Sequence, residues 1–168
     1  MVDQFLTEER KIKLQHAAAN SQLNAAVVLE NVHDPHNIGA VLRSCDSVGI
    51  RDVFVLYNEE SENARKLSVG LNSSSGALKW VRVHFYEDTN KCMLEVKKRY
   101  GLVAGTHLSE KSVPLYDMDL TSSIAFVFGN ERDGISNKVK SFLDTNFIIP
   151  QFGMVQSLNI SVACAVTV

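Results

Sequence analysis

Residues 148–168, IIPQFGMVQSLNISVACAVTV, carry the strongest structural signal in this chain of 168 residues. Residues 147–149 are typical of a buried strand, which ends at Pro150 because proline cannot donate a hydrogen bond to a central ladder. From Ser157 onward the spacing is helical, with apolar or small residues on nearly every side. We expect this helix to be buried on all faces, inside a core or against a partner.

Three polar residues, Gln156, Ser157 and Asn159, interrupt this apolar stretch at the start of the predicted helix. Packing gives no reason for them to lie there. Ligands of parallel sheets bind at the carboxyl ends of strands and close to helix starts, so the polar group predicts a ligand site. The helical pattern continues to Val168 without a terminating residue, and we therefore expect the C-terminal helix to be truncated in this sequence.

The composition fits one globular domain, with 45% hydrophobic residues, 21% charged residues and a net charge of −2. This balance excludes a protein-wide positive field, so any contact with nucleic acid needs a local basic patch. Cys45, Cys92 and Cys164 are odd in number and occupy apolar helical positions, which favours reduced core thiols and a cytoplasmic protein. We expect no membrane association, because no signal peptide or long apolar run is present.

Strand and helix patterns alternate along the chain, as in β-α-β units. The expected strands are residues 25–29, 52–57, 79–85, 102–106, 124–128 and 147–149. The expected helices are residues 7–19, 38–48, 61–67, 88–100, 136–143 and 157–168, with a long connection at 109–123. We predict an α/β domain over residues 24–168, with a mainly parallel sheet and helices on both faces, preceded by a basic helical extension over residues 1–23.

Several common site motifs are absent or incomplete. The glycines form no dinucleotide fingerprint, and the segment 129–136 has P-loop spacing but carries Ile135 where the phosphate-binding lysine belongs. His33 and His36 offer two imidazoles without the further ligands of a metal site, so we expect no metal.

Three segments begin just past predicted strands: residues 37–43 (NIGAVLR), 128–136 (FGNERDGIS) and 149–159 (IPQFGMVQSLN). Together they resemble motifs one, two and three of the SpoU-type RNA 2′-O-ribose methyltransferases of the SPOUT superfamily. Residues 33–37 (HDPHN) and 153–159 (GMVQSLN) are most similar to the TrmH branch, which methylates a D-loop guanosine of tRNA. A ribosomal RNA methyltransferase, a non-catalytic RNA- or cofactor-binding module and a methyltransferase of small molecules or proteins remain as alternatives, the last disfavoured by the basic N-terminal helix.

The resemblance implies a C-terminal deep trefoil knot and a bound S-adenosylmethionine, released as S-adenosylhomocysteine. Three loops would hold this cofactor largely through backbone groups, with glycines where the backbone approaches it closely. Asn130 departs from the pattern, since relatives often carry a small residue there. The cofactor-binding residues implied are Thr106, His107, Leu108, Phe128, Gly129, Asn130, Ile149, Gly153, Met154, Ser157 and Leu158.

The resemblance also assigns activation of the ribose hydroxyl to the motif-one arginine, Arg43. A guanidinium is a poor base because its pKa exceeds about 12. We therefore expect Arg43 to bind an adjacent phosphate and to hydrogen-bond the hydroxyl, with that phosphate as a candidate proton acceptor. The residues expected to orient Arg43 and the ribose are Asn37, Glu131, Ser157 and Asn159.

The expected partners are an RNA, most specifically a tRNA, and a second copy of the chain. In the family the C-terminal helix packs against its partner and the motif-one arginine serves the neighbouring cofactor. Arg10, Lys11 and Lys13 give the first helix a basic face, which fits either RNA binding or a solvated helix. His36, next to motif one, completes the predicted RNA-binding set.

Overall fold

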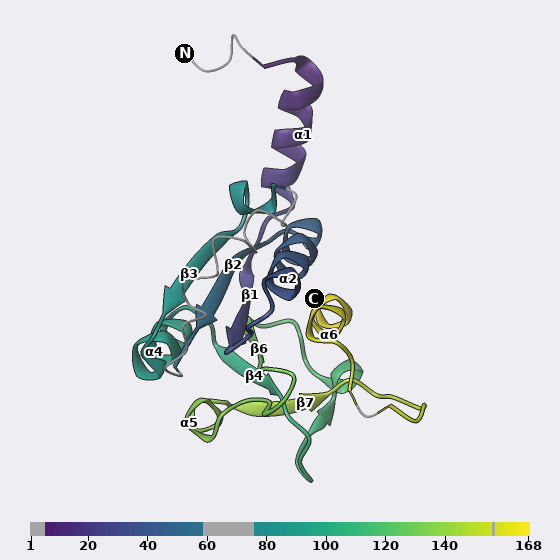
Figure 1. Ribbon diagram of the computed structural model, residues 1–168. Coiled ribbons are helices and arrows are strands. Elements are labelled where there is room, and N and C mark those ends of the chain that lie inside the picture. Colours follow the sequence, from purple (N-terminus) through teal and green to yellow (C-terminus); the bar gives the residue numbers. More distant parts are fainter. Residues whose placement is uncertain (1–5, 59–75, 156) are drawn as a thin grey trace.

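The computed structural model describes residues 6–58, 76–155 and 157–168. Its centre is a seven-stranded sheet in the order β3-β2-β1-β6-β4-β7-β5, and every pair of neighbours is parallel (Figure 1). The strands are β1 Gln22–Glu30, β2 Ile50–Leu56, β3 Arg82–Tyr86, β4 Leu102–Thr106, β5 Val113–Pro114, β6 Ile124–Phe128 and β7 Thr145–Ile148. The predicted parallel α/β fold is confirmed.

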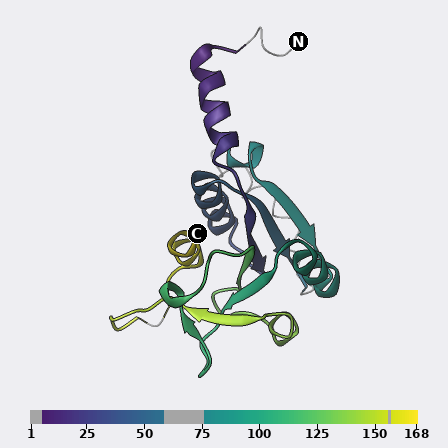
Figure 2. The same ribbon diagram turned by 180° about the vertical axis from the view of Figure 1, so that it is seen from behind.

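Helices cover both faces of this sheet. The α-helices are α1 Glu8–Ala19, α2 Pro35–Val48, α4 Thr89–Arg99, α5 Asn137–Lys140 and α6 Ile160–Thr167, and the 3-10 turns are η3 Ala77–Lys79 and η4 Leu115–Asp117. α2 and α6 lie side by side on one face, and α4 and α5 lie on the other, as the two opposite views show (Figures 1 and 2). α1 extends away from the sheet and buries none of its twelve residues.

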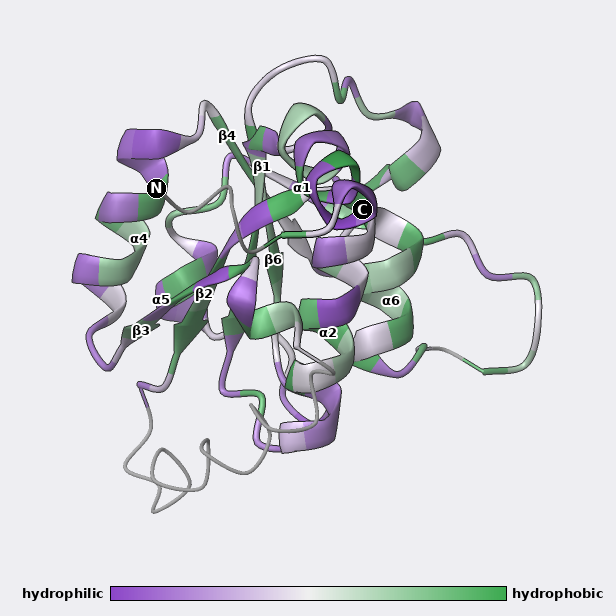
Figure 3. Ribbon diagram, turned by 90° about the horizontal axis from the view of Figure 1, so that it is seen from above, coloured by the Kyte–Doolittle hydropathy of each residue, from purple (hydrophilic) through white to green (hydrophobic). Residues whose placement is uncertain are grey.

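The central strands explain why the sheet forms. β6 is apolar and buried along its whole length, and β1 is buried from Ala25 to its end. Continuous apolar runs of this kind suit parallel strands covered on both faces. Alternate residues of each strand then enter two separate cores, for example Val27 against α2 and Val28 against α4. Figure 3 shows the resulting concentration of hydrophobic residues along the strands.

Helix α2 begins earlier than the sequence pattern predicted. Its N-cap is Asp34, whose side chain accepts a hydrogen bond from the His36 backbone N–H at 2.8 Å, and Pro35 follows in the first turn. Proline fits there because the missing N–H has no intrahelical acceptor. Asn37, predicted to be the last residue before the helix, therefore lies within its first turn, and its side chain is available for other contacts.

Helix α6 differs from its prediction in two respects. It begins at Ile160 with Asn159 as N-cap, so Ser157 and Leu158 belong to the preceding loop. It also packs on α2 through one face only. Val162 and Val166 remain 47% and 41% exposed. Within the described residues this face is not buried in the core of the single chain, and its burial against a partner stays a prediction.

Three further predictions need correction. The pattern at residues 79–85 is the end of η3 followed by β3, and Phe85 stays half exposed because β3 is an edge strand. The helix predicted at 136–143 is a single turn, α5. The connection at 109–123 contains the short β5 and η4. The helix predicted at 61–67 lies outside the described residues.

Two predictions on composition can be compared with the structure. Cys45, Cys92 and Cys164 are buried and unbonded to one another by disulfides, as expected. Within the described ranges, no helix is both long and apolar enough to cross a membrane.

A buried carboxyl group joins β2, β3 and α4. Asp52, 4% exposed, accepts two hydrogen bonds from the Arg82 guanidinium at 3.0 and 2.6 Å and contacts His84 Nε2 at 2.7 Å. The Tyr100 hydroxyl also donates to it, at 3.4 Å. Burial alone would raise the pKa of Asp52, but the hydrogen bonds and charges of Arg82 and His84 outweigh burial and lower it.

We predict that Asp52→Asn lowers the free energy of unfolding at neutral pH by about 1–2 kcal/mol, because the charged hydrogen bonds between Asp52 and Arg82 are lost. The effect is limited because the Arg82 side chain is partly exposed to solvent. A lowered folded pKa stabilises the fold above the unfolded pKa and loses that effect as pH falls through the folded value. The difference between wild type and variant should therefore shrink below about pH 4.

Urea unfolding at neutral and acidic pH measures this difference. Asp117→Asn is the matched control, since Asp117 is an exposed residue of η4. An Asp52→Asn deficit that is constant across the whole pH range would contradict the role given to the Asp52 charge.

Candidate functional site

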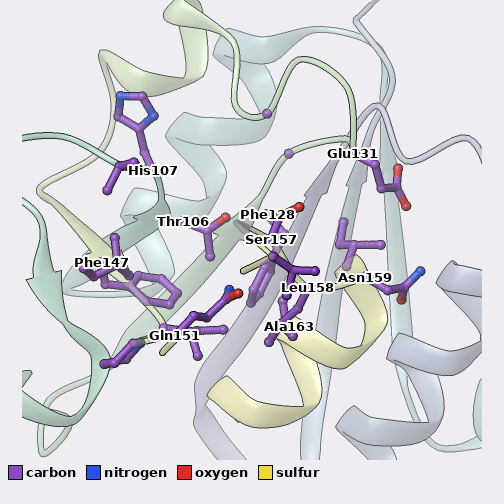
Figure 4. A pocket seen from close by; sticks show the side chains of 18 of the residues that line it. Thr106, His107, Phe128, Glu131, Phe147, Gln151, Ser157, Leu158, Asn159 and Ala163 are labelled. Atoms are coloured by element: carbon purple, nitrogen blue, oxygen red, sulfur yellow. The ribbon is translucent and has the colours of Figure 1, made fainter. Parts of the chain in front are cut away.

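A cavity of about 990 Å³ opens at the carboxyl edge of the sheet, beside β6, β4 and β7 (Figure 4). These strands are neighbours in the sheet, so the loops that follow them converge at one place. The cavity is lined by Thr106, His107, Leu108, Phe128, Gly129, Asn130, Glu131, Gly134, Phe147, Ile148, Ile149, Pro150, Gln151, Gly153, Val155, Ser157, Leu158, Asn159, Ile160 and Ala163.

The loop after β6 closes on itself. The Asn130 side chain accepts hydrogen bonds from the backbone N–H groups of Arg132 and Asp133 at 2.8 and 2.7 Å. Gly134 adopts a φ of 67°, which favours glycine, and its N–H donates to the Asn130 carbonyl. A side chain at Gly129 would collide with the backbone of Gly134. Gly129 is thus required by the loop itself, and not only by the approach of a ligand.

Glu30, at the carboxyl end of β1, anchors the far end of the same loop. It is 1% exposed, and its two carboxyl oxygens accept hydrogen bonds from the Ser136 hydroxyl at 2.6 Å and the Ser136 N–H at 2.8 Å. Ser136 in turn caps α5. The sequence interpretation missed this anchor; its only signal was an acidic residue directly continuing a buried apolar run.

A line of hydrogen bonds connects the three motif segments beside the cavity. The Asn37 amide donates to Glu131 Oε1 at 2.6 Å, and the Asn159 amide donates to Asn37 Oδ1 at 3.1 Å. The Asn159 oxygen remains engaged as the cap of α6, where it accepts from the Ser161 N–H. Side chains separated by 94 and 122 residues in sequence are thereby fixed at one edge of the sheet.

Most of the predicted cofactor-binding residues line the cavity, and Met154 does not. Met154 is fully exposed, one position beyond Gly153, where an added Cβ would meet no atom within 4 Å. Of the predicted catalytic residues, Glu131, Ser157 and Asn159 line the cavity and Asn37 contacts two of them. Arg43 lies exposed on α2, outside the lining of this cavity.

The predicted RNA-binding residues lie at two places. His36 is exposed in the first turn of α2, close to Asn37. Lys11 forms an ion pair with Glu8 at 2.8 Å within α1, whereas Arg10 and Lys13 line a second cavity at the other end of the molecule.

Several lining residues were not singled out from the sequence. Phe147, Ile148, Ile160 and Ala163 form apolar walls, and their only signal was membership of apolar runs. Gln151 adds a polar side chain between Pro150 and the glycine loop. Gln156, part of the predicted polar group, lies outside the described residues.

His107 contributes an uncharged ring to the cavity. Burial, together with the positive charge of Lys140, lowers the pKa of this imidazole below its ordinary value. A neutral ring at pH 7 can both donate and accept a hydrogen bond. The cavity therefore combines apolar walls with neutral hydrogen-bonding groups and one carboxylate, Glu131.

Comparison with known proteins identifies relatives of this arrangement. The sequence model of the SpoU rRNA Methylase family matches residues 24–168. A tRNA (guanosine(18)-2′-O)-methyltransferase from Aquifex aeolicus is 34% identical over 99% of this chain and 77% of its own length. The crystal structure of the A. aeolicus TrmH/SpoU tRNA modifying enzyme covers 95% of this chain and 79% of that chain, with 30% identity and a TM-score of 0.78.

A more distant structure shares the fold. The SpoU methyltransferase AviRb from Streptomyces viridochromogenes, solved with the cofactor AdoMet, is 24% identical and has a TM-score of 0.72 over 88% of this chain and 55% of that chain. The family match covers every segment that builds the cavity and its hydrogen-bonded edge. On these grounds, the chain belongs to the SpoU rRNA Methylase family.

Proposed function

We propose that this chain is an S-adenosylmethionine-dependent RNA 2′-O-ribose methyltransferase acting on a guanosine in the D-loop of tRNA. The hydrogen-bonded line Glu131–Asn37–Asn159 carries this proposal, because it joins all three motif segments at the rim of one cavity. The relatives named as tRNA (guanosine(18)-2′-O)-methyltransferases support the choice of substrate.

The cavity fits the proposed cofactor. Its volume of about 990 Å³ is ample for one nucleoside-sized ligand. Phe128, Leu158 and Ala163 offer apolar surface for an adenine ring, and three loops present backbone groups to its polar parts. The open side of Gly153 leaves room for close approach. When bound, S-adenosylmethionine supplies a methyl group activated by its sulfonium.

The protein residues position the reactants. In an in-line displacement the carbon–sulfur bond breaks as the ribose oxygen bonds the methyl carbon, and the hydroxyl proton must leave. Glu131 and Asn37 offer an acceptor and an amide fixed to each other at 2.6 Å, suited to orienting the ribose. Arg43 keeps its charge and binds a phosphate next to that ribose, and that phosphate is the candidate proton acceptor.

A homodimer accounts for the location of Arg43. Val162 and Val166 on α6, together with Phe152, Met154 and Val155 in the preceding loop, expose apolar side chains on the same C-terminal segment. Burial of that surface against a second copy removes it from water. In such a dimer Arg43, which lies outside the cavity of its own chain, serves the cavity of the partner.

The proposal includes the C-terminal knot of the family. β7 enters the sheet between β4 and β5, strands that are consecutive in the chain, and the chain then returns to place α6 on α2. This strand order supports threading of residues 149–160 through an earlier loop. An experimental structure in which that segment passes outside every earlier loop would refute the knot.

In this proposal α1, which lies within the extension predicted over residues 1–23, helps to hold RNA. α1 buries no residue, so its sequence is available for a role other than packing. The burial of all three cysteines as unbonded thiols fits a cytoplasmic protein.

The direct test of the proposed function is transfer of labelled methyl groups from S-adenosylmethionine to total tRNA and to ribosomal RNA, assayed side by side. We expect label in tRNA, at the 2′-hydroxyl of a D-loop guanosine after nuclease mapping. Label in ribosomal RNA alone, or at the anticodon, would overturn the substrate assignment.

Arg43→Ala should reduce methyl transfer by at least about a hundredfold, because an electrostatic and positioning contact to the reacting group is lost. The affinity for S-adenosylhomocysteine in calorimetry should change little, since Arg43 is proposed to contact the ribose and a phosphate of the RNA and not the cofactor. Arg132→Ala is the matched control, as an exposed arginine beside the cavity. Equal losses of turnover and cofactor affinity would contradict the role proposed for Arg43.

The dimer predicts a specific response to charge on α6. The wild-type chain should have the mass of a dimer in light scattering at micromolar concentration, and Val162→Asp should shift it toward the monomer because the carboxylate cannot be buried unpaired. Leu94→Asp, at a position 61% exposed on α4, should leave the mass unchanged. A monomeric wild-type chain would be the contrary result.

A further inference from the structure

A second cavity, of about 870 Å³, lies at the end of the molecule opposite the cofactor cavity. It is bounded by one side of α1 from Arg10 to its end, the end of α2, and η3, the short teal turn beside the base of α1 in Figure 1. We call it the basic groove, after its lining side chains. They include Arg10, Lys13, Arg51, Lys79 and Trp80, and Asp46 is the one carboxylate among the described residues that line it.

The floor of the basic groove is firmly built. The guanidinium of Arg51 donates to Asp46 at 2.8 Å, to the Ser21 hydroxyl at 3.0 Å and to the Ala17 carbonyl at 3.0 Å. These bonds join β2 to α2 and to the end of α1. They also neutralise Asp46, so the carboxylate does not compete for the remaining cations.

Those remaining cations face solvent. Arg10, Lys13 and Lys79 are exposed, and no carboxylate within residues 6–58, 76–155 and 157–168 forms an ion pair with them. Lys11, on the same helix, differs because it forms an ion pair with Glu8. Three cations around one groove make a local positive potential in a protein of net charge −2.

Trp80 gives the groove an aromatic surface. It follows η3 directly and is 44% exposed, although its neighbour Val81 is 3% exposed. An exposed indole alone signifies little. An exposed indole in a cavity that lysines also line matches the way proteins bind single-stranded nucleic acid, with cations on the phosphates and an aromatic ring stacked on a base.

We propose that the basic groove binds an unstacked nucleotide of the RNA substrate, with its base on Trp80 and its flanking phosphates on Lys79, Lys13 and Arg10. This proposal rests on the proposed function and extends it to a second point of contact. α2 separates the two sites and has 14 residues, about 20 Å at 1.5 Å per residue. A folded RNA spans that separation, and a single nucleotide does not.

The test uses Trp80 as its own probe, because it is the only tryptophan in the chain. Titration of the full chain with tRNA should quench its fluorescence to saturation, and added salt should reverse the quenching. Guanosine monophosphate at the same concentrations should have little effect, since it provides one phosphate and none of the second contact. Quenching by poly-glutamate as strong as that by tRNA would overturn base stacking in favour of an acidic peptide.

Variants separate the aromatic from the ionic contact. By filter binding, Trp80→Leu should weaken tRNA affinity by roughly tenfold, as expected for loss of one base stack. Lys79→Gln should reduce the slope of log affinity against log salt by roughly 0.7–0.9. Lys91→Gln, an exposed lysine on α4 outside the groove, should change neither quantity.

Kinetics distinguish the groove from the catalytic centre. Both groove variants should raise KM for tRNA with kcat nearly unchanged, because the contact is equally strong before and during methyl transfer. Trp80→Phe, which keeps an aromatic ring, should retain most of the tRNA affinity that Trp80→Leu loses. It also tests base stacking if Trp80→Leu fails to fold. Wild-type affinity and salt slope in Trp80→Leu, Trp80→Phe and Lys79→Gln would refute the groove.

The two proposals fail differently. Methyl transfer by a wild-type chain whose Trp80 does not respond to tRNA would remove the groove and leave the proposed function. Saturable quenching of Trp80 by tRNA, without methyl transfer to any RNA, would refute the proposed function and support RNA binding in the groove.

Discussion

The buried carboxyl group of Glu30 is the contact on which the geometry of the site depends. It lies at the end of β1, almost without solvent, and its oxygens accept hydrogen bonds from the Ser136 hydroxyl and N–H and from the Asn58 amide at 2.8 Å. An unsatisfied polar group there would cost several kcal/mol. Because Ser136 closes the loop after β6, its hydrogen bonds to Glu30 hold in place the loop that carries Glu131. The hydrogen bond between Glu131 and Asn37 then positions Asn37 on α2.

The two ends of the sheet have different characters. At the carboxyl end, loops from three adjacent strands surround an apolar cavity with few charges. At the amino end, cationic side chains of α1 and η3 lie around an exposed indole. α2 runs between them, with Asn37 in its first turn and Val48 at its last, so one helix relates the position of both regions.

Much of the fold and of the cavity could be predicted from the sequence. The runs at 102–106 and 124–128 are strands with the predicted bounds, since continuous apolar runs between helical patterns leave little alternative in a parallel sheet. The resemblance to the SpoU-type methyltransferases implied one cofactor site for Thr106, Gly129 and Leu158, and these residues line the same cavity.

The errors have local physical causes. Asp34 and Asn37 are both suitable N-cap residues, and hydrophobic periodicity does not reveal an N-cap that is followed by proline. The pattern of α6 shows which residues are apolar but not what covers each face. β5 is only two residues long, too short for any alternation to appear. Glu30 pairs with a residue 106 positions away, a contact that no local pattern contains.

The closed loop after β6 has a thermodynamic consequence. Asn130 accepts hydrogen bonds from two backbone N–H groups, Gly129 packs against Gly134, and Ser136 is hydrogen-bonded to Glu30, so contacts within the chain itself order this part of the cavity wall. The conformational entropy of this loop is lost during folding and not during ligand binding. A ligand that enters here meets a preorganised wall, and its contacts with that wall contribute to affinity without a further ordering cost.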